Sequence, residues 1–263
     1  MADTGLRGKV EDYKAYILSL LFFKRLSDNY EWETGNRVRE FTETYGSDPS
    51  DKQMDRMRAE GHDFIIPPGC FWNDVRTAET SEKNERLNDA VNAIAEANQA
   101  LKGIINSVRW NEPAPDGSGN KRIEPEVLVA AMNVLDHIPL DNSNVSPDVL
   151  GDAYEYLIKR FADENKGGTT AGQFYTPPEV REIIIRMIQP QPGQSLYDPT
   201  TGSAGFLIDG AKYTAEIAGF PKLRLYGQES VWNTWAISNI NMHLHGLASR
   251  GGPGGRSQCL DWI

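Results

Sequence analysis

The residues best suited to chemistry follow a short apolar run at residues 195–197. There the chain reads Asp198-Pro-Thr-Thr-Gly202-Ser-Ala-Gly205, an acid followed by a glycine-containing turn. Glycine lets the backbone approach a ligand closely, and a carboxylate at a strand end can pair with a cation such as the ammonium of a methionine moiety. A second acid, Glu229, follows the apolar residues 223–226, a position from which a carboxylate accepts hydrogen bonds from ribose hydroxyls. Together, the two acids predict a nucleoside site.

The second acid alone does not choose the ligand, because nicotinamide enzymes place an acid at the same point. A dinucleotide fold requires Gly-x-Gly-x-x-Gly just past the first strand, and this turn does not supply it. The Gly-Lys-Ser/Thr of a phosphate-binding loop is missing as well. Asp198 would repel a pyrophosphate but attract the zwitterionic methionine end. A nicotinamide-dependent oxidoreductase is therefore the less favoured reading.

The elements that must position these acids alternate between strand and helix. Strands are expected at residues 195–197 and 223–226, and helices at residues 177–188, from the turn to about 218, and at 230–245. This alternation predicts a parallel, doubly wound sheet. Since the carboxyl ends of parallel strands meet at one sheet edge, Asp198 and Glu229 should lie close together.

The chain before this region is helical in pattern. Residues 6–29 predict a mostly buried helix with an apolar stripe that includes Leu18, Phe22 and Leu26, and its role is core packing. The charged stretch 30–60 suits solvated helices broken near residues 46, 49 and 61, and further helices are expected at 81–105, 125–135 and 147–162. Residues 163–172 carry almost no large apolar side chain, so they mark the best domain boundary.

Composition limits the possible functions. A net charge of -10 argues against a surface that binds nucleic acid everywhere, so a DNA-acting chain of this kind should bind DNA weakly by itself. No apolar stretch approaches the length of a membrane span, and no secretory signal opens the chain, which predicts the cytoplasm. Cys70 and Cys259 have no metal-ligand spacing. His243 and His245, two residues apart on a helix, face different sides, so we assign no metal site.

A third motif precedes the first expected strand. Residues 172–178 read Gly-Gln-Phe-Tyr-Thr-Pro-Pro, and with Asp198-Pro-x-x-Gly-Ser-Ala-Gly-Phe-Leu207 they resemble the paired S-adenosylmethionine motifs of adenine-specific DNA methyltransferases. Residues 227–229 (Gly-Gln-Glu) and 239–246 (Asn-Ile-Asn-Met-His-Leu-His-Gly) resemble the next elements of the methylation (M) subunits of type I restriction-modification systems. Residues 16–28 and 152–157 resemble their helical amino-terminal domain, so the resemblance covers most of residues 6–247.

The resemblance implies the fold and the site. The fold would be an α-helical N-terminal domain at residues 1–165, followed at residues 166–263 by a partial α/β domain, Rossmann-like, of the S-adenosylmethionine-dependent methyltransferase type. Tyr175 and Thr176 would lie nearest the methionine end of the cofactor, S-adenosylmethionine, and Glu229 would hold its ribose. The implied cofactor-binding residues are Gln173, Phe174, Tyr175, Thr176, Pro177, Pro178, Asp198, Gly202, Ser203, Ala204, Gly205 and Glu229.

The resemblance also implies the reaction and the partners. An M subunit transfers a methyl group from S-adenosylmethionine to the exocyclic amine of an adenine that is flipped out of double-stranded DNA. The implied partners are DNA, a specificity (S) subunit that recognises the target sequence, a second M subunit and a restriction (R) subunit.

One motif of the family is missing from these 263 residues. The family binds the target adenine with Asn or Asp followed by Pro-Pro and an aromatic residue, and no such run occurs here. After Leu247 the glycine-rich sequence resembles neither a third strand nor the family's continuation. We therefore expect a truncated or frame-shifted M subunit, non-native from about Ala248, with no catalytic residue and no methyl transfer on its own. The alternative is a helical interaction module that binds a specificity subunit and DNA without cofactor.

Overall fold

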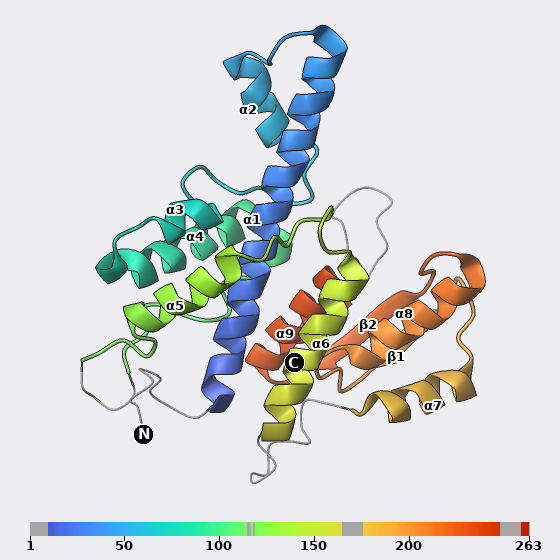
Figure 1. Ribbon diagram of the computed structural model, residues 1–263. Helices are drawn as coiled ribbons and strands as arrows, with labels where there is room; N and C mark the ends of the chain where they lie inside the picture. The colour runs from blue at the N-terminus through green and yellow to red at the C-terminus, as the bar shows by residue number, and fades with distance from the viewer. Residues whose placement is uncertain (1–9, 115–116, 118, 165–175, 248–258, 263) are drawn as a thin grey trace. The chain divides into compact units, whose positions relative to one another are not determined.

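The computed structural model describes residues 10–114, 117, 119–164, 176–247 and 259–262 (Figure 1). The chain divides into two compact units. We call Leu20–Ser146 the helical unit. We call Pro147–Ile263, together with Lys9–Ser19 from the start of the first helix, the sheet unit.

In the described residues, the regular elements of the helical unit are helices, as predicted, apart from an isolated bridge between Pro113 and Lys121. The first, α1, is one continuous helix that runs well past the expected end near residue 29 and stops before Gly46, whose φ of 69° breaks the helix. The predicted interruption near residues 46–49 is thereby confirmed. The helices are α1 (Val10–Tyr45), α2 (Asp51–Ala59), α3 (Trp72–Arg76), η1 (Thr80–Glu82), α4 (Lys83–Ala97), η2 (Gln99–Leu101) and α5 (Pro125–Asp136).

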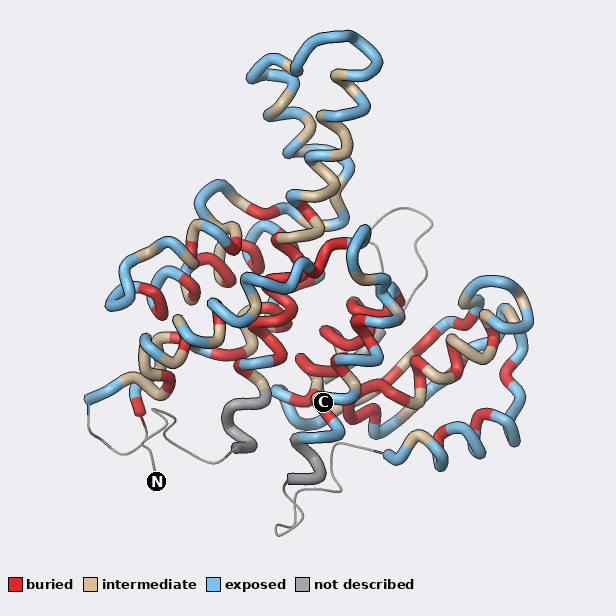
Figure 2. The backbone as a smooth tube through the Cα atoms, viewed as in Figure 1, coloured by how far each residue is buried: buried red, intermediate tan, exposed pale blue. Residues whose placement is uncertain are grey.

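The core of the helical unit forms where α1, α3 and α5 meet. The ring centroids of Phe23 and Trp72 lie 5.9 Å apart, and the Trp72 backbone amide donates to the Ser27 hydroxyl at 2.8 Å. The Trp72 indole donates to Asp136 at 3.0 Å, so the backbone amide and the indole N–H of this buried residue both have a hydrogen-bond acceptor. Figure 2 shows burial concentrated in α1 between residues 16 and 30, whereas its later turns are intermediate or exposed and most of α2 is exposed.

The exposed end of α1 is held to α2 by polar contacts. Arg37 donates to the Met57 carbonyl at 2.6 Å and to the Gly61 carbonyl at 2.7 Å, and so caps the end of α2. The Tyr30 and His62 rings stack at 3.7 Å. These contacts fix a helical hairpin that has little apolar core of its own.

The sheet unit contains the predicted alternation of strands and helices. Within the described residues, its three strands pair in parallel in the order β1-β2-β3. The expected strands near 195–197 and 223–226 are confirmed as β1 and β2. The elements are α6 (Pro147–Glu164), α7 (Pro178–Ile188), β1 (Ser195–Asp198), α8 (Gly205–Ala218), β2 (Arg224–Glu229), α9 (Trp232–Leu244) and β3 (Cys259–Trp262).

The sequence that begins at Ala248 did not resemble a third strand, yet a third strand follows at its end. Residues Cys259–Trp262 form β3, with Cys259 opposite Tyr226 and Trp262 opposite Glu229 on β2. Four residues are too few to show an alternating pattern in the sequence. Their strand conformation comes instead from pairing with the edge of β2, a long-range interaction that local propensity does not report.

The strands bury one face of the sheet. Leu196 and Leu225 are almost fully buried against α8, whereas Tyr197 is 52% exposed on the opposite face. In the described part of the chain, helices α8 and α9 cover only one side of these strands, so the doubly wound arrangement is half represented. The buried side is continuous with a core that includes Ile185, Leu207 and Ile208.

Helix α6 packs with the sheet unit, against α9. The sequence placed the domain boundary at residues 165–166, after this helix; that point lies outside the described residues, and the compact units divide at Ser146. The contact between α6 and α9 depends on Gly151. A Cβ at this position would lie 2.3 Å from two imidazole atoms of His245, which is 6% exposed.

We predict that Gly151→Ala lowers the free energy of unfolding of the sheet unit by about 2 kcal/mol, because the methyl group must push α6 and α9 apart. The matched control is Gly35→Ala in α1, where a Cβ would meet nothing within 4 Å. That substitution should stabilise the helix by about 0.5–1 kcal/mol through propensity alone. Urea unfolding of both variants checks the prediction, and a neutral or stabilising Gly151→Ala would contradict it.

None of the helices in the described ranges combines the length and apolar character that crossing a membrane requires.

Candidate cofactor site

The turn after β1 is compact and internally hydrogen-bonded. Asp198 ends the strand, and its carboxylate accepts the Thr200 amide at 2.9 Å, while the Thr201 hydroxyl donates to the Asp198 carbonyl at 3.1 Å. Gly202 (φ 57°) and Ala204 (φ 67°) are both left-handed. For alanine this conformation costs about 1–2 kcal/mol, which the surrounding structure must offset. The result is a tight turn that leads directly into α8 at Gly205.

Glu229, at the end of β2, closes onto this turn. One oxygen of its carboxylate accepts the Gly202 amide at 3.1 Å, and the other accepts the Val231 amide at 2.8 Å. The Thr201 amide also donates to the Gln228 carbonyl at 2.9 Å. The two acids singled out in the sequence therefore lie at the same sheet edge, joined through the backbone of a single turn.

The remaining predicted residues of the turn lie inside the protein. Ser203, Ala204 and Gly205 are all buried, and the Ser203 carbonyl accepts a hydrogen bond from the Asn241 side chain of α9 at 2.9 Å. Sequence reasoning missed Asn241. Its only signal was its place in the stretch 239–246, because a buried amide that braces a turn has no motif of its own.

The segment before α7 is described only in part. Gln173, Phe174 and Tyr175 lie outside the described residues, so their predicted contacts stay predictions. Thr176 and Pro177 are exposed, and Pro178 begins α7, where its fixed φ and missing amide hydrogen suit the first turn of a helix. The Thr176 carbonyl accepts a hydrogen bond from Arg181 at 3.2 Å.

Arg181 was also missed, and it connects this segment to the turn. Its guanidinium is nearly inaccessible and pairs with Asp209 at 2.6 Å and with Glu155 at 3.0 Å. Burial alone would lower its pKa, but the two carboxylates outweigh burial and raise the pKa of Arg181 above its usual value. The same guanidinium lies against Gly205, where a Cβ would approach one of its nitrogens to 2.4 Å.

The chemistry of this arrangement suits a nucleoside with a cationic end. The carboxylate oxygens of Glu229 each hold one backbone amide, and each retains a second acceptor position for a ribose hydroxyl. The amino terminus of α8 carries a partial positive charge suited to a ligand carboxylate, while Asp198 suits a ligand ammonium. The residues present therefore fit the amino-acid end and the ribose of S-adenosylmethionine.

In the described part of the chain, no three His, Cys, Asp or Glu side chains gather as a metal ion would require. His243 lies in α9 and His245 immediately follows it. Burial lowers the pKa of each to about 4, so both are neutral near pH 7.

The buried His245 predicts a loss of stability in acid. Its pKa falls from 6.5 to about 4, mainly through burial and then through Lys212. Between these two pH values the imidazole is protonated in the unfolded chain but stays neutral in the folded chain. The contribution of His245 to the free energy of unfolding is therefore complete above pH 6.5 and is lost as the pH falls toward 4. We expect about 2 kcal/mol less stability at pH 5 than at pH 7 from this group alone.

Urea unfolding at the two pH values measures this difference, with His245→Gln as the comparison. The variant should lose about 2 kcal/mol of the pH dependence while keeping the part that comes from the buried His243 and from carboxylates. Identical pH dependence in the variant and the unaltered chain would show that the imidazole is not the group responsible.

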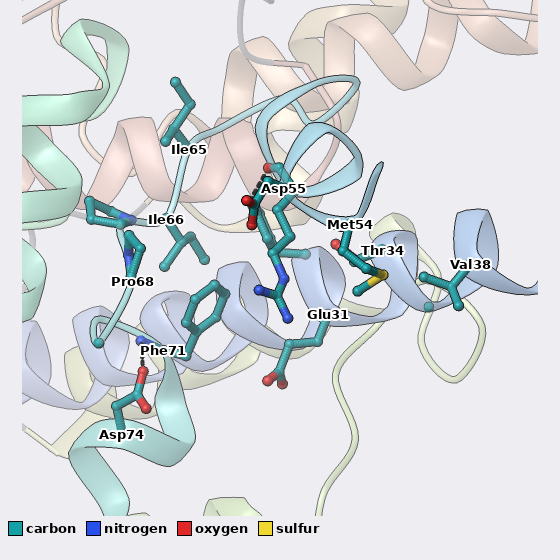
Figure 3. Close-up of a pocket in the computed structure, with 15 residues that line it drawn as sticks. Glu31, Thr34, Val38, Met54, Asp55, Ile65, Ile66, Pro68, Phe71 and Asp74 are labelled. Atoms are coloured by element: carbon teal, nitrogen blue, oxygen red, sulfur yellow. Dashed lines mark hydrogen bonds between the residues drawn. The ribbon is translucent and has the colours of Figure 1, made fainter. Parts of the chain in front are cut away.

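The helical unit carries a separate pocket of about 720 Å³ (Figure 3). Its walls come from α1, α2, the segment before α3 and α3 itself. Apolar side chains such as Ile66 and Phe71 share the lining with the acids Glu31, Asp55 and Asp74. Among the described residues, Arg58 is the one basic side chain in its walls. Burial, followed by repulsion from Asp28, raises the pKa of Glu31. Such a lining disfavours phosphate groups.

Comparison with known proteins places this geometry in a family. Residues 1–135 match the family model described as HsdM N-terminal domain, and residues 145–252 match N-6 DNA Methylase. The HindI methylase subunit of Haemophilus influenzae is 30% identical over 61% of this chain and 35% of its own length. The MpnII methylase subunit of Mycoplasma pneumoniae is 27% identical over 92% of this chain and 48% of its own length. The chain thus spans less than half the length of these curated relatives.

A solved structure agrees in fold. The type I restriction-modification methyltransferase subunit from Streptococcus thermophilus superposes with a TM-score of 0.74 at 22% identity, covering 98% of this chain and 55% of that one. With one family model matching more than half of the chain and a second matching the sheet unit, this chain belongs to the family of methylation (M) subunits of type I restriction-modification systems.

Proposed function

We propose that the sheet unit binds S-adenosylmethionine at the edge formed by Asp198 and Glu229. Asp198 would pair with the ammonium of the methionine moiety, the residues from Gly202 to Gly205 would surround that end, and Glu229 would accept hydrogen bonds from the ribose. The segment of residues 173–178 would cover the cofactor. The observation that carries the proposal is the 3.1 Å hydrogen bond from the Gly202 amide to Glu229, which joins the two predicted regions.

The reaction we propose is that of the family. When bound, S-adenosylmethionine supplies an electrophilic methyl group for the exocyclic amine of an adenine in double-stranded DNA. This chain's own residues orient the cofactor and keep its sulfonium end at the sheet edge. We place the reaction in the cytoplasm, in an assembly with a specificity subunit, a second M subunit and a restriction subunit.

Titration calorimetry of the 263-residue chain tests the cofactor assignment. We expect S-adenosylmethionine to bind with a dissociation constant in the micromolar range, and we expect NADH to produce no heat. Binding of NADH in preference to S-adenosylmethionine would replace the proposal with a nicotinamide-dependent activity.

These 263 residues alone should not transfer a methyl group. They contain Pro-Pro only after Ile66 and Thr176, so no Asn or Asp stands before Pro-Pro to receive the adenine amine. With radiolabelled S-adenosylmethionine and unmethylated double-stranded DNA, incorporation should stay at background. Incorporation above background would show that another group in this chain replaces the missing motif.

A second function is favoured by the pocket of the helical unit. A concave surface of mixed apolar and acidic character suits a polypeptide better than a phosphate backbone. The helical unit would then act as an interaction module that binds a specificity subunit without cofactor. Co-elution with such a subunit, combined with no heat from S-adenosylmethionine, would favour this function over the first.

A further inference from the structure

Two arginines five residues apart on α7 have very different surroundings. The Arg181 side chain is 4% exposed and pairs with Glu155 on α6 and Asp209 on α8. The Arg186 side chain is 67% exposed and pairs with Glu182 of its own helix. Of the two arginines, Arg181 is the one that pairs with other elements of the sheet unit, so Arg186 provides a matched comparison.

The bonds of Arg181 use the whole planar guanidinium. Its Nε donates to Asp209 at 2.6 Å, one terminal nitrogen donates to Glu155 at 3.0 Å, and the other donates to the Thr176 carbonyl at 3.2 Å. The group thus bonds two helices and one backbone carbonyl at once. A lysine keeps the positive charge but cannot present donors in this fixed fork.

The guanidinium also touches the start of α8. A Cβ on Gly205 would lie 2.4 Å from the terminal nitrogen that bonds Thr176, and 2.7 Å from the central carbon. Gly205 directly follows the left-handed Ala204 of the turn. The same nitrogen therefore bonds Thr176, directly before Pro177, and packs on Gly205, the first residue of α8.

We infer that Arg181 is a positioning residue for the cofactor site, holding the Thr176 carbonyl against the start of α8. The inference rests on the proposed function. Through this bond Thr176 keeps a fixed place relative to the turn that begins at Asp198, so less conformational freedom is lost at this residue when cofactor binds. Glu155 and Asp209 orient the guanidinium, and Gly205 makes room for it.

The experiment compares Arg181→Lys, Asp209→Asn and Arg186→Lys in the full chain. Each variant is first unfolded in urea, and binding is measured by calorimetry with S-adenosylmethionine under conditions where its sheet unit is fully folded. We expect Arg181→Lys to weaken binding about tenfold, as loss of a charge-assisted hydrogen bond does. Asp209→Asn, which keeps an acceptor oxygen and is the milder change, should weaken binding less. Arg186→Lys should bind as the unaltered chain does.

Hydrogen exchange supplies a measurement that does not depend on the cofactor. The amides of Val180 and Arg181 donate to the Pro177 carbonyl at 3.0 and 3.1 Å, directly after the segment that Arg181 holds. Exchange across residues 176–181 should rise in Arg181→Lys and stay unchanged in Arg186→Lys, with β2 unaffected in both.

The outcomes separate the two claims. A folded Arg181→Lys chain with unaltered cofactor affinity and unaltered exchange overturns the positioning role. If the unaltered chain binds no S-adenosylmethionine, the proposed function fails, and exchange across residues 176–181 alone decides whether Arg181 holds this segment. Faster exchange with unaltered cofactor affinity would show that Arg181 orders the segment but has no part in binding, which also overturns the inference.

Discussion

Replacing Asp198 with alanine should weaken S-adenosylmethionine binding at least tenfold. The carboxylate stands at the end of β1 beside the amino terminus of α8, where we propose that it pairs with the ligand ammonium, and charge-assisted hydrogen bonds of this kind typically carry about 1.5–3 kcal/mol. The substitution also removes the acceptor of the Thr200 amide, which holds the turn closed. Calorimetry with S-adenosylmethionine measures the change.

Two further variants show whether the charge is responsible. Asp198→Asn keeps the shape and an acceptor for the Thr200 amide but loses the charge, so it should fall nearer to alanine than to the unaltered chain. Glu182→Gln removes an acid from the exposed side of α7 and should leave the affinity unchanged. An Asp198→Ala chain that is folded and binds with unaltered affinity would remove Asp198 from the site.

Arg181→Met should lower the free energy of unfolding of the sheet unit by about 3 kcal/mol. Methionine fills much of the space but leaves Glu155 and Asp209, whose side chains are 16% and 25% exposed, without their shared cation. Removing one partner of a buried ion pair is costly because the remaining charge has been taken from water and is no longer compensated. Urea unfolding monitored by tryptophan fluorescence measures this change in the free energy of unfolding.

Arg186→Met is the control for this loss. The same substitution on the same helix breaks one exposed pair with Glu182, which should matter by less than about 0.5 kcal/mol. Equal effects at the two positions would mean that the contacts of Arg181 do not stabilise the sheet unit.

The contrast between these arginines shows where sequence reasoning stops. Both lie in a helix that the sequence correctly predicted, and both carry acidic neighbours in the chain. The partners that bury Arg181 are 26 residues before it and 28 residues after it, on α6 and α8. Nothing local distinguishes the two positions, because burial here is set by how three helices pack.

The turn between β1 and α8 was predictable because its determinants are local. An acid at a strand end, a glycine at a left-handed position and the start of a helix all lie between Asp198 and Gly205. Because these residues are adjacent in the chain, their local sequence was enough to predict the turn. The proximity of Glu229 followed from a single topological rule about parallel strands. Asn241, which braces Ser203 from α9, had no comparable signal.

The ends of helices were predictable where they depend on local residues, and elements that depend on tertiary contacts were not. Gly46 and Pro147 mark helix ends through their own backbone preferences, so they were visible in the sequence. The grouping of α6 with the sheet unit involves the close approach of Gly151 to His245 at the end of α9, and β3 depends on the edge of β2. Tertiary contacts of this kind decide structure without leaving a local pattern.

Chemical-shift mapping on a 15N-labelled chain can show whether the Asp198 turn and Glu229 bind one ligand together. The amides of Thr200, Gly202 and Val231 each donate to one of the two acids, so each reports the charge state and contacts of its carboxylate. On addition of S-adenosylmethionine we expect all three resonances to shift with a common dissociation constant, while amides of α4 and α5 stay unmoved. Saturable binding that leaves the Gly202 and Val231 amides unshifted would place the cofactor elsewhere and contradict the proposed site.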